Sequence, residues 1–439
     1  MTDMTIVLRS LRARSLASVV TVAMVAVAVA LLLVLLSMRA AASEAFRRGT
    51  GNVHLLVSAD ASPLVAVLNG MFYANAPANP LSAAKVKEIA EGFPWQWTLP
   101  TQLGDSFRGS PVVAAPKKFL TTFEPIVGQG FSLAQGRHLE NDFEVVVGSE
   151  AARTHGLRVG TKIAMTHGVS IAGSEHAGHE HTDHPYEVVG VLNPTGSAHD
   201  RALFTTLESS WIIHAEERRE REHESEPEAE SHAHEHDHAH DHIDAADLTD
   251  ADRLVTGILL RLPTRPGSDA SASIAAQFDR LRRDTSITVA QPAQQIGRLM
   301  AIVGDIDWLF VAMGVVVLVS SAISILLATA SSMELRRRQV AILRVLGASA
   351  WRVFVLGLTE STLIGLAGAV LGCAIAVVGC FAASALLAQR VGLTFGTGVD
   401  PRSAAMVVIG AVALSALAGV IPAAKAYRTT VASHLRPIA

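Results

Sequence analysis

The residues with the clearest capacity for chemistry are histidines, which gather in two short segments of the chain. Thirteen of the 18 histidines lie in residues 165–184 and 213–242, and from Ser231 the second segment reads SHAHEHDHAHDH. Neutral imidazole is a good ligand for zinc, copper and nickel, and the acidic residues between the histidines add carboxylate oxygens. We therefore expect binding of a divalent transition metal, zinc foremost. The predicted ligands are His176, His179, His181, His184, His232, His234, His236, His238, His240 and His242.

Two other interpretations of these segments stay open at the level of sequence. A His-x-His series has many ligand registers and no unique geometry, which predicts moderate affinity, poor selectivity and no permanently bound cofactor. The run AEERREREHESEPEAESHAHEHDHAHDH is poor in apolar residues, so a solvated acidic loop, disordered without ligand, is the plain alternative. A pH switch is the third interpretation, because histidine titrates at about pH 6.5.

Composition indicates a membrane protein with a large aqueous domain. Half of the residues are hydrophobic, 17% are charged, and the net charge of −4 gives no basic excess that would favour nucleic acid. A helix needs about 20 apolar residues to cross a bilayer, and four runs meet that length. The predicted transmembrane helices are 16–38, 308–331, 353–387 and 403–424. The first exceeds the roughly 7–15 apolar residues of a signal peptide, so it is interpreted as an uncleaved anchor.

The distribution of arginine and lysine predicts the orientation. Basic residues are concentrated in residues 1–15, 332–352 and 425–439, and the positive-inside rule assigns such segments to the cytoplasm. Both termini are then cytoplasmic, whereas residues 39–307 and the short loop 388–402 are external.

A helical stalk is predicted directly before the second transmembrane helix. Residues 291–307 carry Ile296, Leu299 and Val303 at helical spacing, which indicates a helix continuous with the membrane span. We expect it to pack on a similar extension of the first span near Arg39–Arg48. A stiff helix of this kind would carry motion between the external domain and the cytoplasmic side.

The third span contains a carboxylate, Glu360. An ionisable residue within a membrane is by default a functional candidate. Because Glu360 lies near the cytoplasmic end, we interpret it as a residue that reaches the interface or pairs with a loop arginine, rather than as a proton or ion carrier. Small residues that would let another helix approach closely follow at Gly365, Gly368, Ala369 and Gly372.

Two motifs suggest a family. The cytoplasmic loop reads ELRRRQVAILRVLGAS, residues 334–349. The end of the chain, from within the last span, reads GVIPAAKAYRTTVASHLRP, residues 419–437. These motifs, with one span, a large external domain and three further spans, resemble the FtsX-like permeases of the MacB and LolC/LolE type, subunits of bacterial ABC systems. In that family the first motif forms the coupling helix, which sits in a groove of the ATPase. The resemblance assigns this contact to Glu334, Arg336, Arg337, Arg338, Gln339, Leu343, Arg344 and Gly347.

The chain departs from the family motif at two positions. Gln339 stands where the family has glutamate, and Ala341 where it has glycine. Docking on an ATPase stays the expectation, but any salt bridge from that glutamate is lost.

The external part adds to the resemblance. Residues 128–163 and YEVVGVL, residues 186–192, resemble the periplasmic core domain of the same family. The runs EVVVG, YEVVGVL and RALFTTLES predict strands, whereas LSAAKVKEIAEGF and ASIAAQFDRLRRD have helical periodicity. The expected fold is an α-helical membrane protein with four transmembrane helices and a MacB-type α+β periplasmic core domain inserted between helices 1 and 2.

The chain is not expected to be an enzyme. It contains neither Gly-x-Ser-x-Gly nor His-Glu-x-x-His, and GLRVGTK lacks the Gly-Lys-Ser/Thr ending of a Walker A motif. Its two cysteines, Cys373 and Cys380, lie in an apolar span and are interpreted as buried residues. ATP hydrolysis is therefore expected on a separate ABC ATPase subunit.

The resemblance implies a permease subunit of the bacterial inner membrane, present as a homodimer or beside a related permease and surrounded by membrane lipid. Together with the histidines it suggests a role in zinc handling at the envelope. Two alternatives stay open: export or extraction of a lipoprotein, peptide or hydrophobic compound, and a non-transporting mechanotransmitting regulator of a periplasmic enzyme. A periplasmic metal-binding protein or a lipoprotein is the expected further partner.

The orientation is testable by cysteine labelling in a Cys373→Ala/Cys380→Ala background. A cysteine at Ser231 is expected to react with a membrane-impermeant thiol reagent in intact spheroplasts, because the positive-inside rule puts residues 39–307 outside. A cysteine at Ser349 is expected to react only after permeabilisation. Labelling in the opposite order would contradict the predicted topology.

Overall fold

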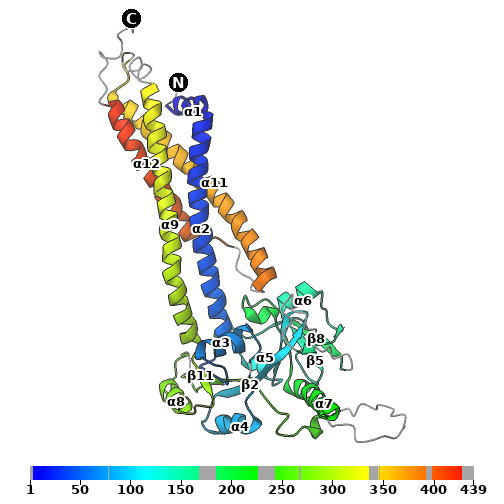
Figure 1. Ribbon diagram of the computed structural model, residues 1–439. Helices are drawn as coiled ribbons and strands as arrows, with labels where there is room; N and C mark the ends of the chain where they lie inside the picture. The colour runs from blue at the N-terminus through cyan, green and yellow to red at the C-terminus, as the bar shows by residue number, and fades with distance from the viewer. Residues whose placement is uncertain are drawn as a thin grey trace. The chain divides into compact units, whose positions relative to one another are not determined.

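Four long apolar helices and one mixed β-sheet dominate the described part of the chain (Figure 1). The computed structural model describes residues 3–77, 79–167, 184–225, 243–265, 268–335, 345, 347–391 and 398–427. The chain divides into two compact units. The helical unit comprises residues 1–42, 302–387 and 395–439, and the sheet unit comprises residues 43–301 and 388–394.

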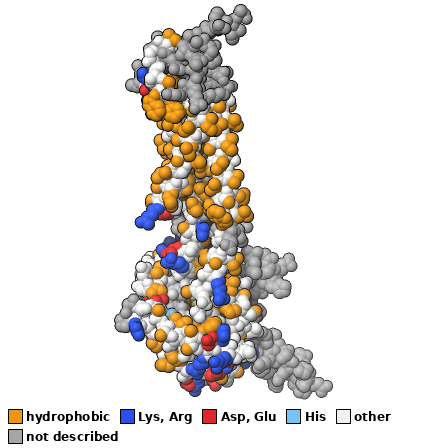
Figure 2. Space-filling model, turned by 90° about the vertical axis from the view of Figure 1, so that its left-hand side faces the viewer, with side chains coloured by type: hydrophobic (Ala, Val, Ile, Leu, Met, Phe, Trp, Pro, Cys, Tyr) orange, Lys and Arg blue, Asp and Glu red, His pale blue; other side chains and the backbone are white. Residues whose placement is uncertain are grey.

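The helical unit contains the predicted membrane spans. Its helices are α1 (Asp3–Ala13), α2 (Ser15–Thr50), α9 (Pro292–Leu335), α11 (Ala350–Val391) and α12 (Pro401–Tyr427). Four of them, α2, α9, α11 and α12, are long and apolar enough to cross a membrane. Hydrophobic side chains cover much of this unit on the face shown in Figure 2, as expected for a surface that meets lipid. The predicted four transmembrane helices are thus confirmed by length and composition.

The spans are held together by small and branched apolar side chains. Val25, Ala28 and Val29 of α2 form one buried cluster with Ile325 of α9 and Ala369 of α11. Gly368 of α11 comes so close to α2 that an added Cβ would lie 2.6 Å from the Cβ of Val25. The close approach expected from the small residues of the third span is therefore confirmed.

The predicted stalk is confirmed as part of one unbroken helix. α9 begins at Pro292, although its apolar span begins at Trp308. The first helix is extended as well, since α2 continues to Thr50. Phe46 of α2 and Leu299 of α9 pack against one hydrophobic core of the sheet unit, which includes Phe72.

The sheet unit is built on an 11-stranded mixed sheet. The order of its main path is β11-β1-β10-β2-β3-β9-β5-β8-β4, with β6 paired to β8 and β7 to β2. The β3–β9 and β5–β8 pairs are parallel, and the other pairs are antiparallel. The strands are β1 (Leu55–Ser58), β2 (Trp97–Phe107), β3 (Ser110–Ala115), β4 (Leu133–Gly136), β5 (Glu144–Val147), β6 (Lys162–Ile163), β7 (Thr166–His167), β8 (Tyr186–Leu192), β9 (Leu203–Thr206), β10 (Gly257–Arg261) and β11 (Thr288–Ala290).

Short helices accompany the sheet. They are α3 (Pro63–Phe72), α4 (Ala83–Glu91), α5 (Phe119–Thr122), α6 (Ser149–His155), α7 (Leu207–Ser225) and α8 (Ile274–Leu281), with 3-10 turns at Ala198–Arg201 and Ala245–Asp247. The strands predicted from EVVVG, YEVVGVL and RALFTTLES are confirmed as β5, β8 and β9. The two predicted helices are confirmed as α4 and α8.

The second histidine-rich segment begins later than the sequence suggested. The prediction of a loop from residue 213 is wrong for residues 213–225, which belong to α7. The acidic composition favoured disorder, but the first half of this helix has apolar residues to bury. Ile213 packs in one hydrophobic cluster, and Ile212 and Ala215 pack in a second with Ile243. Burial of these side chains stabilises the helix against its weak amphipathic pattern.

A single carboxylate organises the turn before β5. Glu144 is buried and forms a two-pronged ion pair with Arg137, with nitrogen–oxygen distances of 2.6 and 2.8 Å. Its oxygens also accept hydrogen bonds from the backbone N–H groups of Glu140 and Asn141. Bonding to the Arg137 guanidinium keeps the pKa of Glu144 well below its usual value of 4.5. The Gly-Arg and acidic turn that resemble the family motif thus stabilise the backbone before β5.

We expect Glu144→Gln to lower the free energy of unfolding of the sheet unit by roughly 2 kcal/mol, because it removes a charge-assisted bidentate pair. Folding lowers the pKa of Glu144, so this contribution is present above about pH 4.5 and is lost as the pH falls further. Denaturant unfolding of residues 43–301 at several pH values measures it. The matched control is Glu140→Gln in the same turn, where the side chain is exposed and an effect below about 0.5 kcal/mol is expected. Equal losses in both variants would contradict the assignment.

Candidate functional site

Two of the predicted coupling residues, Glu334 and Gly347, lie within the part of the chain that the structure describes. Glu334 belongs to the last turn of α9, whereas Arg336, Arg337, Arg338, Gln339, Leu343 and Arg344 lie outside the described residues. Gly347 has a positive φ of 95°, which is a conformation that side chains disfavour. Shortly after it, the hydroxyl of Ser349 accepts a hydrogen bond from the backbone N–H of Arg352 at 3.2 Å. Gly347 and Ser349 therefore form the turn and the N-cap from which α11 starts.

The predicted metal ligands lie almost entirely outside the described residues. This applies to His176, His179 and His181 in the first segment and to the six histidines from 232 to 242 in the second. His184 is described and lies just before β8. Within the described ranges, no group of three or more histidine, cysteine, aspartate or glutamate side chains is arranged to hold a metal ion. The structure does describe the residues on either side of the two segments and the bonds that hold them.

One carboxylate, that of Glu216 in α7, holds the ends of both segments. Its Oε2 lies 2.8 Å from Nε2 of His184, the first described residue after 168–183. Its Oε1 accepts a hydrogen bond of 3.1 Å from the backbone N–H of Ile243, the first described residue after 226–242. Both segments therefore rejoin the fold at the same side chain.

The His184 ring is also fixed by packing. It stacks on Phe143 with ring centroids 4.9 Å apart and an interplanar angle of 12°. A carboxylate on one ring nitrogen sets the tautomer and orientation of a histidine, which is how second-shell partners prepare metal ligands. The His184–Glu216 pair has this form.

A second histidine–carboxylate pair lies near the start of the first segment. Nε2 of His214 in α7 lies 3.3 Å from the nearer carboxylate oxygen of Asp105 in β2. In the register between β2 and β7, Asp105 is opposite His167, the last described residue before 168–183. α7 thus bonds to Asp105, the strand partner of His167, and to His184, and these two histidines flank residues 168–183.

Glu360 has a different partner from the one expected. Its buried carboxylate pairs with Arg14, at the junction of α1 and α2, and not with an arginine described in the loop. Ser10 donates to the same carboxylate at 3.1 Å. Nη1 of Arg14 also donates to the carbonyl oxygen of Ala328 in α9 at 3.4 Å. The interpretation of Glu360 as an ion-paired residue is therefore confirmed with a corrected partner.

His199, a buried histidine that sequence analysis did not single out, lies against the last turn of α2. Nδ1 of His199 is 2.6 Å from the hydroxyl of Tyr73, and its Nε2 is 3.2 Å from the carbonyl oxygen of Gly49. Burial lowers the pKa of His199 to about 4, so the ring is neutral near pH 7. Nothing in its neighbourhood in the sequence, SAHDRALF, distinguishes it from a surface histidine. Within the sheet unit it connects the last turn of α2 to the 3-10 turn at Ala198–Arg201.

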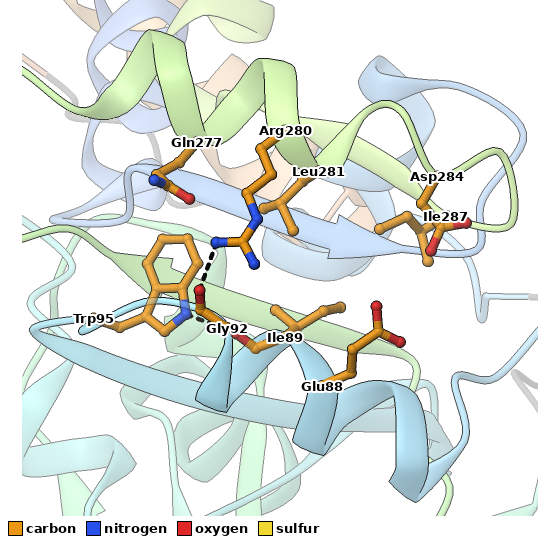
Figure 3. A pocket seen from close by; sticks show the side chains of 9 residues that line it. All are labelled: Glu88, Ile89, Gly92, Trp95, Gln277, Arg280, Leu281, Asp284 and Ile287. Atoms are coloured by element: carbon orange, nitrogen blue, oxygen red, sulfur yellow. Dashed lines mark hydrogen bonds between the residues drawn. The ribbon is translucent and has the colours of Figure 1, made fainter.

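A small pocket lies between α4 and α8 (Figure 3). Its volume is about 100 Å³, and Trp95, Arg280 and Leu281 are among its lining residues. Arg280 donates to the carbonyl oxygen of Gly92, as Figure 3 shows. Lys85 bonds to both Glu88 and Asp284. Hydrogen bonds from the hydroxyl of Ser286 and from Lys85 lower the pKa of Asp284 to about 2. The polar groups here serve to join the two helices.

Two family models agree with this architecture. The family model of the MacB-like periplasmic core domain matches residues 18–240, and that of the FtsX-like permease C-terminal region matches residues 311–431. Among solved structures, the extracellular domain of the noncanonic ABC-type transporter YknZ from Gram-positive bacteria is similar at 7% sequence identity and a TM-score of 0.27, covering 54% of this chain and 98% of that chain. The search of curated proteins finds no match.

Proposed function

The chain belongs to the FtsX-like permeases with a MacB-like periplasmic core domain, and we propose that it is the permease subunit of an ABC transporter that handles a transition metal, zinc foremost, outside the membrane. The family implies a partner ATPase. We place the chain in the bacterial inner membrane with both termini in the cytoplasm, paired with a second copy or with a related permease.

The contact with the ATPase is proposed for residues 334–349. This stretch carries the motif resemblance and lies between two helices, with α9 ending at Leu335 and α11 beginning at Ala350. The turn at Gly347 and the cap at Ser349 support the proposal, because they end the stretch abruptly and start a rigid helix. A displacement of the stretch would therefore act on both helices.

Transmission of that displacement is proposed to follow α2 and α9. Each is one continuous helix with residues in both units. In the sheet unit, Phe46 of α2 and Ile296 of α9 meet the same hydrophobic core, and His199 bonds to Gly49. A helix anchored in this way moves as a rod, so a shift at the cytoplasmic end reaches the sheet.

Metal capture is proposed for the two histidine-rich segments acting together. The observation that supports this is the Glu216 carboxylate, which bonds to the first described residue after each segment. Ligands from both segments can then bind the same ion. Because both segments end at one side chain, fewer residues have to become ordered when the ion binds. Zinc suits the ligand set of imidazole with carboxylate.

The coupling proposal is tested by Gly347→Trp and by Arg337→Glu/Arg338→Glu in the permease purified with its ATPase. Tryptophan is strained at a φ of 95° and bulky at the turn, so we expect about a tenfold loss of ATP turnover with membrane insertion unchanged. Co-purification of the ATPase is measured in parallel. Arg265→Glu in the sheet unit is the matched charge-reversal control. Unchanged ATPase recovery and turnover in both variants would contradict the proposal.

The metal proposal is tested by replacing the six histidines from 232 to 242 with serine. Deletion of residues 226–242 is unsuitable. The backbone of Ile243 bonds to Glu216, whereas α7 continues to Ser225, about 14 Å further along the helix axis, so a direct join would have to span that distance. The full-length protein is expected to bind more than one zinc ion, and the variant is expected to lose most of this capacity. Affinity should weaken below about pH 6.5, where protons compete for imidazole.

Calorimetry and metal analysis decide the result. Glu216→Gln is expected to weaken zinc binding about tenfold or more, because it removes the carboxylate that orients His184 and bonds at Ile243. Glu208→Gln, in the first turn of the same helix, is the matched control and is expected to bind as the wild type does. Equal zinc uptake by the wild type and the serine variant would mean that the histidines form a solvated spacer.

A further inference from the structure

Arg14 occupies the single position between two helices. α1 ends at Ala13 and α2 begins at Ser15. From this junction its guanidinium forms an ion pair with Glu360 of α11 and donates to the carbonyl oxygen of Ala328 in α9 at 3.4 Å. One side chain therefore joins the junction of α1 and α2 to two other long helices of the same unit.

The two helices that Arg14 joins are those on either side of residues 336–349. Ala328 lies in the last turns of α9, which ends at Leu335. Glu360 lies near the start of α11, which begins at Ala350. The two helices on either side of the proposed coupling segment are thus bonded to one residue from another part of the chain.

The pair is costly to bury, and this makes its geometry specific. The Glu360 side chain is 8% exposed and that of Arg14 is 22% exposed. Removing two charges from water costs several kcal/mol per ion, which is recovered only when the partners and the remaining hydrogen bonds are well placed. Ser10 of α1 supplies one of these bonds, since its hydroxyl lies 3.1 Å from both carboxylate oxygens.

A weaker contact joins the same elements nearer to the coupling segment. Asp3 of α1 accepts hydrogen bonds of 2.6 and 3.0 Å from Arg352 in the first turn of α11. Both side chains are about half exposed, so this pair is screened by water and contributes little by itself. It shows that α1 follows the start of α11 at two separate points.

We propose that Arg14 and Glu360 are positioning residues for ATPase coupling, which hold α9 and α11 at a fixed spacing so that movement of residues 336–349 is passed on to both helices. The inference rests on the proposed coupling function. It predicts that charge balance alone is insufficient, because the bond from Arg14 to the α9 backbone is part of the tie. A proton-carrying role for Glu360 is the competing explanation, and it needs no contact with α9.

The test uses the full-length permease purified with its ATPase. The variants are Arg14→Gln, Glu360→Gln and the exchanged pair Arg14→Glu/Glu360→Arg. Arg12→Gln is the matched control, since Arg12 is an exposed arginine in the last turn of α1, two residues before Arg14. Three quantities are measured: permease in the membrane, ATPase retained on purification, and ATP turnover. A cysteine at Ser349, in a Cys373→Ala/Cys380→Ala background, reports nucleotide-dependent thiol reactivity at the end of the coupling segment.

We expect Arg14→Gln and Glu360→Gln to retain the ATPase, to lose about tenfold in turnover and to lose the nucleotide-dependent change at Ser349. The exchanged pair is expected to restore the permease level while turnover stays low, because an arginine at 360 balances the charge without tying the α1–α2 junction to Ala328. Arg12→Gln should behave as the wild type does. Should Glu360→Gln fail to reach the membrane, the exchanged pair decides on the same measurements.

Two results would overturn the inference. Wild-type turnover in Glu360→Gln, or in the exchanged pair, would show that the tie is not needed for coupling. Gly347→Trp, measured alongside, separates this outcome from failure of the proposed function. If Gly347→Trp lowers ATP turnover and the Arg14 and Glu360 variants do not, only the inference about Arg14 and Glu360 fails. If none of these variants changes ATP turnover, the proposal that residues 334–349 contact the ATPase fails as well.

Discussion

The hydrocarbon interior of a membrane offers the backbone no hydrogen-bonding partner, and this constraint decides how the rest of the chain is built. Each crossing has to be a helix that satisfies its own amides. Here two of the crossing helices continue beyond their apolar lengths: α9 starts at Pro292, well before Trp308, and α2 runs to Thr50. The helical continuations end in the sheet unit, where Phe46 and Leu299 pack against its core.

The buried carboxylates of Glu144 and Glu360 find their arginine partners in two different ways. Glu144 finds Arg137 and two backbone amides within one turn, so a short stretch of sequence contains the whole arrangement. Glu360 depends on Arg14, which is 346 residues away in the chain. Both arginines satisfy a carboxylate, but only the second reaches a third element, because its guanidinium has donors left for the Ala328 carbonyl. A local pair stabilises a turn, whereas a remote pair sets the spacing of helices.

The same distinction explains what could be predicted from sequence. The spans follow from the length of their apolar runs, β5 and β8 from runs of β-branched residues, and α4 from its helical periodicity, all of which are local properties. The length of α7 did not follow, because its acidic composition suggested a loop while Ile213 and Ala215 are buried by strands and turns distant in sequence. Arg14 was recognised only as one of the basic residues that set the orientation. Its partner became apparent only when α1, α9 and α11 were placed together.

For the histidine-rich segments, the fold adds information that composition does not contain. Counting histidines identifies the ligand chemistry but says nothing of where the segments leave and rejoin the domain. The register between β2 and β7 puts His167 opposite Asp105, which bonds to His214 of α7. Two residues further along the same helix, Glu216 bonds to His184 and to the backbone at Ile243. Because α7 packs on the sheet through β2, β3 and β9, the residues that flank both segments are bonded to a helix that contacts the centre of the sheet.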